Sequence, residues 1–328
     1  MKKWIAPVLA LGLALSACSQ GGMQKVSEEE APDGILKELA ALETNNDSDT
    51  VYDTLTKLVT KTGEQYGYQI ELDAEQKSSY PSIQNEELAV SNAEIKSRNI
   101  RFAKSDQLYE FLWQQIGQNT AQAAMMDASP DTAKLVRLSL NADGKYVIDA
   151  IQDQNLSLGL DEDSDVEYIM NQSALAPIYP YLGTNYILQP LSDTKHYSYE
   201  LFKQGNQYIF IMKIKDVTTY NEDIDSYVNT NYGYPRTDLN GDGSIMVDEY
   251  TTTDATFKIY MDETGLIQKI ENENKSDLER EGKTITVGET QSVTLTKAPD
   301  DFETFAESTF KGIKDETIKQ GDTLDIKY

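Results

Sequence analysis

Apolar residues spaced three and four positions apart mark the first part of this chain as helical. They form two clusters before Gly63, which offers a stop: Ile35, Leu36, Leu39 and Leu42, then Val51, Leu55, Leu58 and Val59. A longer helix is expected from Ser105, as N-cap, to about Met126, with an apolar face formed by Leu108, Leu112 and Ile116 and widened by Phe111 and Trp113. Between Gly63 and Ser105, apolar residues alternate with polar ones at Tyr66, Tyr68, Ile70 and Leu72, and this alternation predicts one strand. Residues 35–130 are therefore predicted to form a helix-rich segment packed on a sheet.

The period changes to two from Leu135 onward, and three hairpins are expected. Their turns are 141–144, 203–206 and 262–265, each rich in Asn, Asp or Gly and flanked by alternating apolar residues. Thr284–Val287 and Val293–Thr296 add β-branched strand candidates. Residues 131–328 are thus predicted to be β-rich. The fold class that follows is α+β, with a curved antiparallel meander, resembling half a barrel, covered by helices.

Composition narrows the chemistry that this chain can perform. The 328 residues include 55 Asp and Glu against 29 Lys and Arg, a net charge of -26, which repels phosphate backbones, so we expect no nucleic acid partner. With one Cys and one His, the chain lacks the residues for a disulfide framework or a Cys/His zinc site. Carboxylate chemistry and cation binding remain.

The amino terminus has the pattern of an export signal. Lys2 and Lys3 precede an apolar run over residues 4–15, and Leu15-Ser16-Ala17-Cys18 follows. This tetrapeptide resembles the bacterial lipobox, which implies cleavage after residue 17 and a diacylglycerol group on the sulfur of Cys18. The alternative is an ordinary signal with a chance Cys. We expect a signal peptide over 1–17, a flexible acidic tether over 18–34, and a mature protein anchored to the bacterial cell membrane on its extracytoplasmic side.

One segment carries a metal-binding pattern. Residues 238–249 resemble the twelve-residue calcium loop of EF-hand proteins, and that resemblance implies Ca²⁺ ligands at Asp238, Asn240, Asp242, Ser244 (through its carbonyl) and Glu249. In this resemblance, Gly243 would lie at the sharp bend of the loop, and the apolar side chain of Ile245 would pack so as to fix the exit of the loop. The alternative is a metal-free hairpin turn over 240–243, which does not require the acids at both ends.

The surroundings of this loop differ from those of a calcium sensor. Met246 occupies a position that is often polar, Pro235 opposes an entering helix, and residues 251–259 favour a strand on exit. We therefore expect a loop inserted between strands or irregular segments, with a structural ion bound at about 10⁻⁴–10⁻³ M.

An acidic cluster and the single histidine are two further candidate sites. Asp161–Asp165 is an acidic cluster without the glycine of a calcium loop, and a solvated loop is expected there. His196 has no second His or Cys to work with and is expected to be a polar surface residue.

The lipobox, the early helices and the run of hairpins resemble bacterial lipoproteins of the LolA and LppX type. That resemblance implies a half-barrel whose concave face can hold acyl chains. Three hypotheses follow: a non-enzymatic calcium-binding surface lipoprotein that presents a face to a ligand or a surface protein, a carrier or sensor of a hydrophobic small molecule, and a hydrolase that uses two carboxylates.

Overall fold

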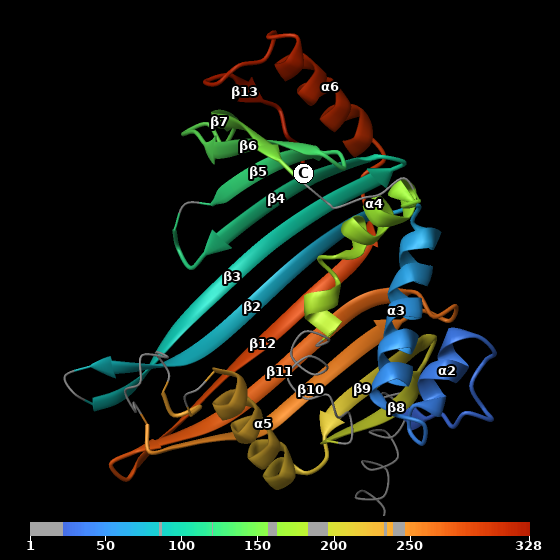
Figure 1. The fold of residues 1–328 in the computed structure, drawn as a ribbon, viewed down its shortest axis with the longest axis vertical. Coiled ribbons are helices and arrows are strands. Elements are labelled where there is room, and N and C mark those ends of the chain that lie inside the picture. Colours follow the sequence, from blue (N-terminus) through green and yellow to red (C-terminus); the bar gives the residue numbers. More distant parts are fainter. Residues whose placement is uncertain are drawn as a thin grey trace, which may run out of the picture.

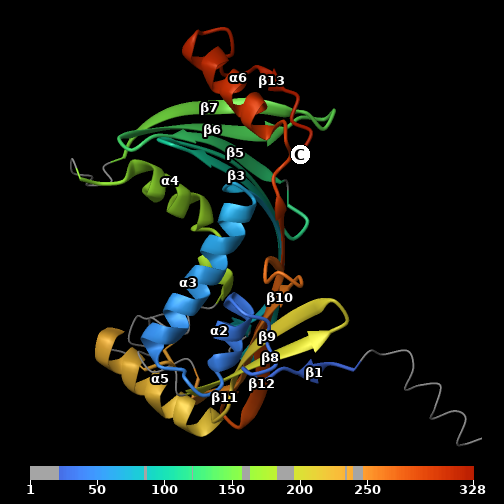
Figure 2. The same cartoon turned by 90° about the vertical axis from the view of Figure 1, so that its right-hand side faces the viewer.

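A single curved antiparallel sheet dominates the structure. The computed structural model describes residues 22–84, 87–119, 121–156, 163–182, 196–232, 235–238 and 247–328. Its 13 strands follow one another across an open sheet (Figures 1 and 2). In spatial order they are β1 (Gln24–Lys25), β8 (Tyr197–Gln204), β9 (Gln207–Ile214), β10 (Glu249–Met261), β11 (Ile267–Arg280), β12 (Lys283–Lys297), β2 (Gln69–Gln84), β3 (Glu87–Lys104), β4 (Gln107–Ile116), β5 (Gln122–Ala128), β6 (Thr132–Leu140), β7 (Tyr146–Asn155) and β13 (Thr323–Leu324).

The helices are few and occupy both sides of the sheet. On the concave side lie α2 (Ile35–Ala41), α3 (Ser48–Gln65), α4 (Val166–Leu175) and α5 (Val217–Tyr232), whereas α6 (Phe302–Lys314) lies on the convex side (Figure 2). The α+β prediction of a sheet covered by helices is therefore wrong, although the expected curvature is present. Residues 35–130 are not helix-rich either, because the chain is almost entirely strand from Gln69 to Ala128.

The helix expected from Ser105 to Met126 is a pair of strands. Ser105 has a positive φ of 52° in the turn between β3 and β4, where no helix N-cap forms. The strand β4 is apolar on both faces: Tyr109, Phe111 and Trp113 point one way, and Leu108, Leu112 and Ile116 point the other. Two apolar faces satisfy a period of three to four as well as a period of two, so the pattern alone misled the assignment.

Other elements agree with the sequence pattern. The two early helices are α2 and α3, and the hairpins β6–β7, β8–β9 and β10–β11 turn at the expected residues. Gly63 does not end α3. A Cβ there would lie 2.6 Å from Cδ2 of Leu175, so Gly63 instead lets the end of α4 pack closely on α3.

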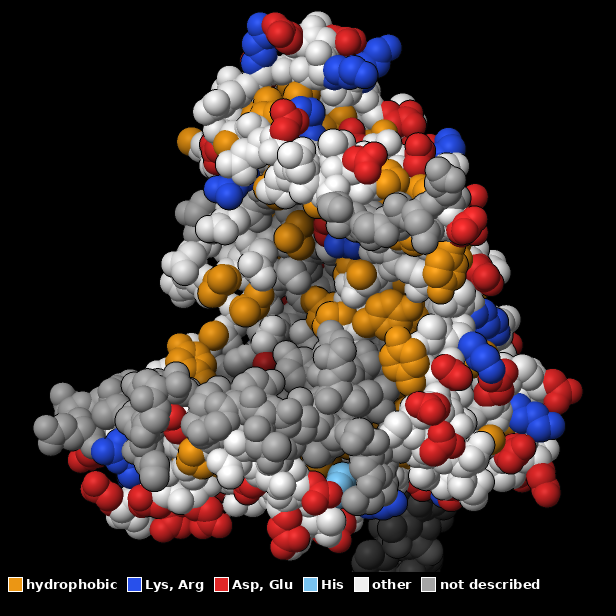
Figure 3. All heavy atoms as spheres, in the orientation of Figure 1, with side chains coloured by type: hydrophobic (Ala, Val, Ile, Leu, Met, Phe, Trp, Pro, Cys, Tyr) orange, Lys and Arg blue, Asp and Glu red, His pale blue; other side chains and the backbone are white. Residues whose placement is uncertain are grey.

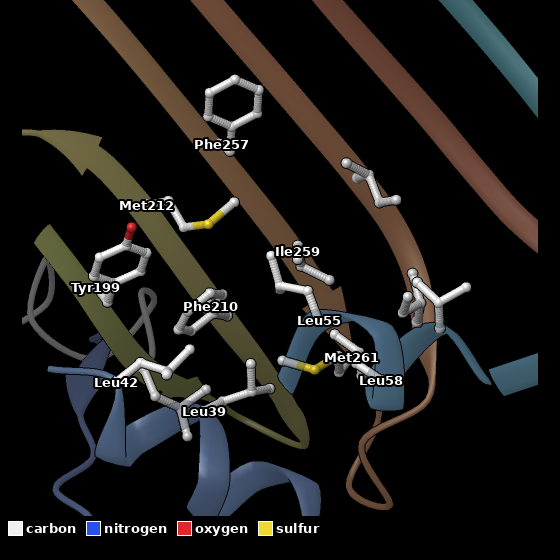
Figure 4. Packing of buried hydrophobic residues seen from close by; sticks show 14 of the residues in the cluster. Leu39, Leu42, Leu55, Leu58, Tyr199, Phe210, Met212, Phe257, Ile259 and Met261 are labelled. Carbon is white, nitrogen blue, oxygen red and sulfur yellow. The ribbon is translucent and has the colours of Figure 1, made fainter. Parts of the chain in front are cut away.

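The lower part of the sheet, comprising β1, β8–β12 and β2, buries its concave face. Leu39 and Leu42 at the end of α2 and Leu55 and Leu58 of α3 cover the strands (Figure 4). The strand residues facing them include Tyr199, Phe210, Met212, Phe257, Ile259 and Met261. All are buried, which makes this the largest core of the described residues.

The buried face changes side between β2 and β3. Ile70 pairs with Arg101, and Glu71 pairs with Ile100. Because directly paired residues point to the same face, the apolar residues of β2 lie on the concave face and Ile100 lies on the convex face. The register of this one strand pair therefore moves the core from one side of the sheet to the other.

The upper part of the sheet, comprising β3–β7 and β13, accordingly buries its convex face under α6. This second core contains Phe302, Ala306, Phe310 and Ile313 of α6. Its strand residues include Ile100, Phe102, Phe111, Met125, Val136 and Ile148. The concave face of these strands is consequently not needed for the main upper core.

Gly288 permits a close approach between two central strands. A Cβ at this position of β12 would lie 2.3 Å from the backbone oxygen of Asn274 on β11, and 3.2 Å from the Cα of Lys275. No real Cβ tolerates such a distance to backbone, so the sheet is locally shaped around the missing side chain.

We expect Gly288→Ala to lower the free energy of unfolding by about 1–3 kcal/mol, as in other overpacked interiors. The sign of this change in the free energy of unfolding is informative, because alanine normally stabilises a strand relative to glycine. Urea unfolding followed by circular dichroism measures it, with Thr290→Ala on the same strand as control. Equal or greater stability of the Gly288 variant would contradict the close approach.

Candidate functional site

The concave face of the upper strands is only partly covered by helix. Nearest to α4, the cross-strand neighbours Ala103, Leu108, Ala128 and Ala133 are buried beneath Met170 and Ala174. Four residues further along β3, the row formed by Asn99, Leu112, Ala124 and Arg137 lies beyond that cluster. The helix therefore covers one end of this face and leaves the next rows available.

An ion pair separates the covered end from the uncovered one. Arg101 Nη2 lies 2.9 Å from Glu110 Oε1, which also accepts a hydrogen bond from Asn99 Nδ2 at 2.7 Å. A third contact runs from Arg101 Nη1 to the backbone oxygen of Ser173 on α4. Charge and backbone contacts thus fix α4 against the sheet, and Oε1 of Glu110 accepts from both Arg101 and Asn99.

A depression with a volume of about 710 Å³ occupies the uncovered part, and we call it the concave groove. Its lining comes from Leu112 and Gln114 of β4, Gln122 and Ala124 of β5, Leu135, Arg137 and Ser139 of β6, and Asp149 of β7. This volume is typical of sites for small organic ligands. Figure 3 shows hydrophobic side chains gathered around the hollow on this side of the molecule.

The floor of the groove is apolar and accessible. Leu112 is 39% exposed although it lies in the middle of a central strand. Its direct neighbour on β5 is Ala124, and Leu135 on β6 lies in the next row, where it pairs with Met126. Ile116, on the same face of β4, is 47% exposed. Single exposed apolar residues need no explanation, but two on one concave face beside a pocket indicate a binding surface.

Polar groups border this floor. Gln114 pairs across the strands with Gln122, and Gln122 pairs with Ser139. The Oγ of Ser139 donates a hydrogen bond to Asp149 Oδ1 at 2.8 Å. Arg137 lies beside Ala124 in the cross-strand register. An apolar floor with polar groups at its border fits an amphiphilic molecule better than a purely apolar or purely ionic one.

The structure fixes the neck of the predicted calcium loop. Val247 N donates a hydrogen bond to Thr237 O at 3.3 Å, so the entry and the exit of the loop are adjacent. Asp238 is 3% exposed at the entry, and Glu249 is exposed at the start of β10. Val247 is buried against Leu278 and Val287, so a core residue anchors the exit. Asn240, Asp242, Ser244 and Ile245 lie outside the described residues.

The entry to the loop is held by a buried arginine. Arg236 Nη2 donates to Asn221 Oδ1 of α5 at 2.7 Å, Nε lies 2.9 Å from Asp225 Oδ1, and the guanidinium covers the ring of Tyr250. Burial lowers the pKa of Arg236, and the Asp225 carboxylate opposes that shift. The segment before the loop is thus tied to both α5 and β10. The expected strand on exit is present, whereas the chain enters from a helix that ends at Tyr232.

The structure describes the predicted calcium loop only at its two ends. Within the described part of the chain, no cluster of three Asp, Glu, His or Cys side chains could hold a metal ion. The hydrogen bond between Val247 and Thr237 closes the neck of the loop, one residue before Asp238 and two residues before Glu249.

The other predicted sites have different outcomes. His196 is 2% exposed, with Nε2 2.8 Å from Asp223 Oδ2 and its ring against Tyr220, so the expectation of a surface residue is wrong.

In the acidic cluster, Asp165 caps α4 by accepting a hydrogen bond from Tyr168 N, and Asp161 and Glu162 lie outside the described residues. Cys18 and the predicted signal peptide also lie outside them. No helix among residues 22–328 that the structure describes is long and apolar enough to cross a membrane.

Sequence reasoning missed the concave groove because it placed residues 105–126 in a helix. The alternating aromatics Tyr109, Phe111 and Trp113 were the available indication of a strand. The neighbouring β6 was predicted as a strand, but its concave residues, Leu135 and Arg137, could not be joined to β4 without β5.

Comparison with known proteins gives limited information. No protein-family model and no curated protein matches the sequence. Among solved structures, a DUF1329 family protein from Desulfovibrio piger is 11% identical over 74% of this chain and 91% of that chain, with a TM-score of 0.20. A LolA superfamily protein from Nitrosomonas europaea is 8% identical over 76% of this chain and 96% of that chain, with a TM-score of 0.20.

A third solved structure, a DUF1849 beta-barrel-like protein from Brucella abortus, is 9% identical over 70% of this chain and 96% of that chain, at a TM-score of 0.19. The matched structures thus include a member of the LolA superfamily, which is one of the groups that the sequence resembles. At TM-scores this far below 0.5, none of them transfers a ligand or an activity to this chain.

Proposed function

We propose that this chain is a non-enzymatic, lipid-anchored extracytoplasmic protein that holds a hydrophobic or amphiphilic small molecule in the concave groove. The observation that carries the proposal is the accessible apolar floor of Leu112, Ala124 and Leu135 within a depression of about 710 Å³. A protein that only presented a rigid outer surface would gain nothing from leaving a central-strand leucine uncovered.

The anchor and the groove are compatible parts of one molecule. A lipid on Cys18 would keep the protein beside a membrane, which is a source of hydrophobic ligands. The predicted flexible tether over 18–34 is wrong from Gln24 onward, because β1 pairs with β8 and both Val26 and Ala31 are buried in the lower core. An anchor on Cys18 would therefore hold the folded part close to the bilayer. Carriage or sensing of a ligand is therefore better supported than a purely structural role.

We expect the full chain to bind the neutral apolar dye N-phenyl-1-naphthylamine, with a rise in its fluorescence. Leu112→Asp should weaken this binding about tenfold or more, because a carboxylate on the apolar floor must be desolvated by the dye. Long-chain alcohols should displace the dye from the wild-type chain.

Val90→Asp is the matched control. Val90 lies on the adjacent strand β3, is also 39% exposed, and does not line the groove. Its substitution should leave dye binding unchanged. Absence of dye binding, or an equal loss in both variants, would refute the groove as the ligand site.

We further propose that loop 238–249 binds calcium as a structural ion. The supporting observations are the five matching ligand positions in the sequence and the closed neck between Thr237 and Val247. The loop connects α5 to β10 near the lower core, whereas the concave groove lies on β4–β7. Calcium would accordingly stabilise the fold and take no direct part in ligand binding.

Calcium at about ten times its dissociation constant should raise the free energy of unfolding by about 1.4 kcal/mol, because only the folded loop binds the ion. Differential scanning calorimetry with and without calcium measures the effect. Glu249→Gln should remove it, and Glu263→Gln, in the β10–β11 turn, should retain it. A calcium response that persists in the Glu249 variant would reject the loop as the binding site.

A further inference from the structure

We infer that the concave groove selects an amphiphile with an anionic head group, which Arg137 binds, while the alkyl chain lies across Ala124 and Leu112. This inference rests on the proposed function and specifies its ligand. It depends on the state of Arg137, on the order of residues across the strands, and on the donors beside them.

Arg137 forms no ion pair with a carboxylate of the described residues, and it is the arginine in this state that lines the groove. Among the described residues, Arg98 pairs with Asp73, Arg101 with Glu110, and Arg236 with Asp225. No acidic side chain of the described residues lies within 4 Å of Arg137, although acids outnumber bases 55 to 29. The one carboxylate in the groove, Asp149, accepts its hydrogen bond from Ser139.

The cross-strand register places the charge at one end of an apolar path. Arg137 pairs with Ala124, and Ala124 pairs with Leu112. Neighbouring strands are about 4.8 Å apart, so the Cα atoms of Arg137 and Leu112 are separated by about 10 Å. A molecule with its head on the guanidinium can thus extend its chain over Ala124 to Leu112, and onward toward Ile116.

Further donors favour an anion over a neutral head group. The side-chain amides of Gln114 and Gln122 lie next to this path, and both line the groove. A guanidinium offers paired N–H groups that match the oxygens of a carboxylate or a phosphate. The overall negative charge of the protein opposes anions only at long range, since salt screens it beyond about 8 Å under physiological conditions.

The test compares three competitors for the bound dye: dodecanoate, dodecanol and acetate. For the wild-type chain, dodecanoate should displace the dye at about one tenth of the concentration that dodecanol needs, a difference of about 1.4 kcal/mol. Acetate, which has the anion without the chain, should not displace it. High salt should reduce the preference for dodecanoate.

Arg137→Gln should abolish the preference while leaving displacement by dodecanol unchanged. Arg280→Gln is the matched control, because Arg280 also forms no ion pair with a described residue but lies at the end of β11, away from the groove. Equal displacement by the two dodecyl compounds in wild type, or a preference that survives in the Arg137 variant, would overturn the inference. Displacement by acetate alone would indicate a site for free anions and would also overturn it.

These outcomes are distinct from failure of the proposed function. If the groove binds hydrophobic molecules without regard to charge, dye binding and the effect of Leu112→Asp persist and only the head-group preference is lost. If the groove binds nothing, the dye itself does not bind.

Discussion

The register between β2 and β3 is the constraint on which the architecture depends. Pairing Ile70 with Arg101 and Glu71 with Ile100 puts the apolar residues of two adjacent strands on opposite faces of one sheet. Since a sheet can bury each face only against something else, the lower strands are covered on the concave side by α2 and α3, and the upper strands on the convex side by α6. A slip of one residue would place the apolar residues of both strands on the same face, and one of the two cores would lose its cover.

This exchange of faces explains why an apolar groove can remain open without loss of the fold. The upper strands obtain their stability from Phe302, Phe310 and their neighbours on the convex side. Their concave side is covered at one end by α4, and the Arg101–Glu110 pair marks where that cover stops. Leu112, Ala124 and Leu135 can therefore serve a ligand, because the core does not require them.

The calcium loop and the groove lie on different strands and have different supports. The ends of the loop are held by Arg236, Asn221 and the buried Val247, whereas the groove depends on cross-strand register. Under the two proposals, such separation would let an ion stabilise one region while a ligand enters and leaves another. The same separation makes the two proposals independently testable.

The sequence by itself determined the local elements whose apolar pattern is one-sided. The helices α2 and α3 and the hairpins after Leu135 were predictable because each has one apolar face and one polar face, with Gly, Asn or Asp at the turns. The residues of the calcium pattern were also recognisable, since their spacing is local. His196 was misplaced because its burial depends on Tyr220 and Asp223, which lie more than twenty residues away.

Only the tertiary structure decided how β4 is used and what it faces. Its residues are apolar on both sides, so their spacing satisfied a helix and a strand equally, and pairing with β3 and β5 in the sheet selected the strand. The groove likewise joins residues from four strands, and its unpaired Arg137 becomes visible only when every nearby carboxylate has been placed. Local sequence fixes periodicity, whereas the choice of face, and with it the binding surface, is a property of strand register.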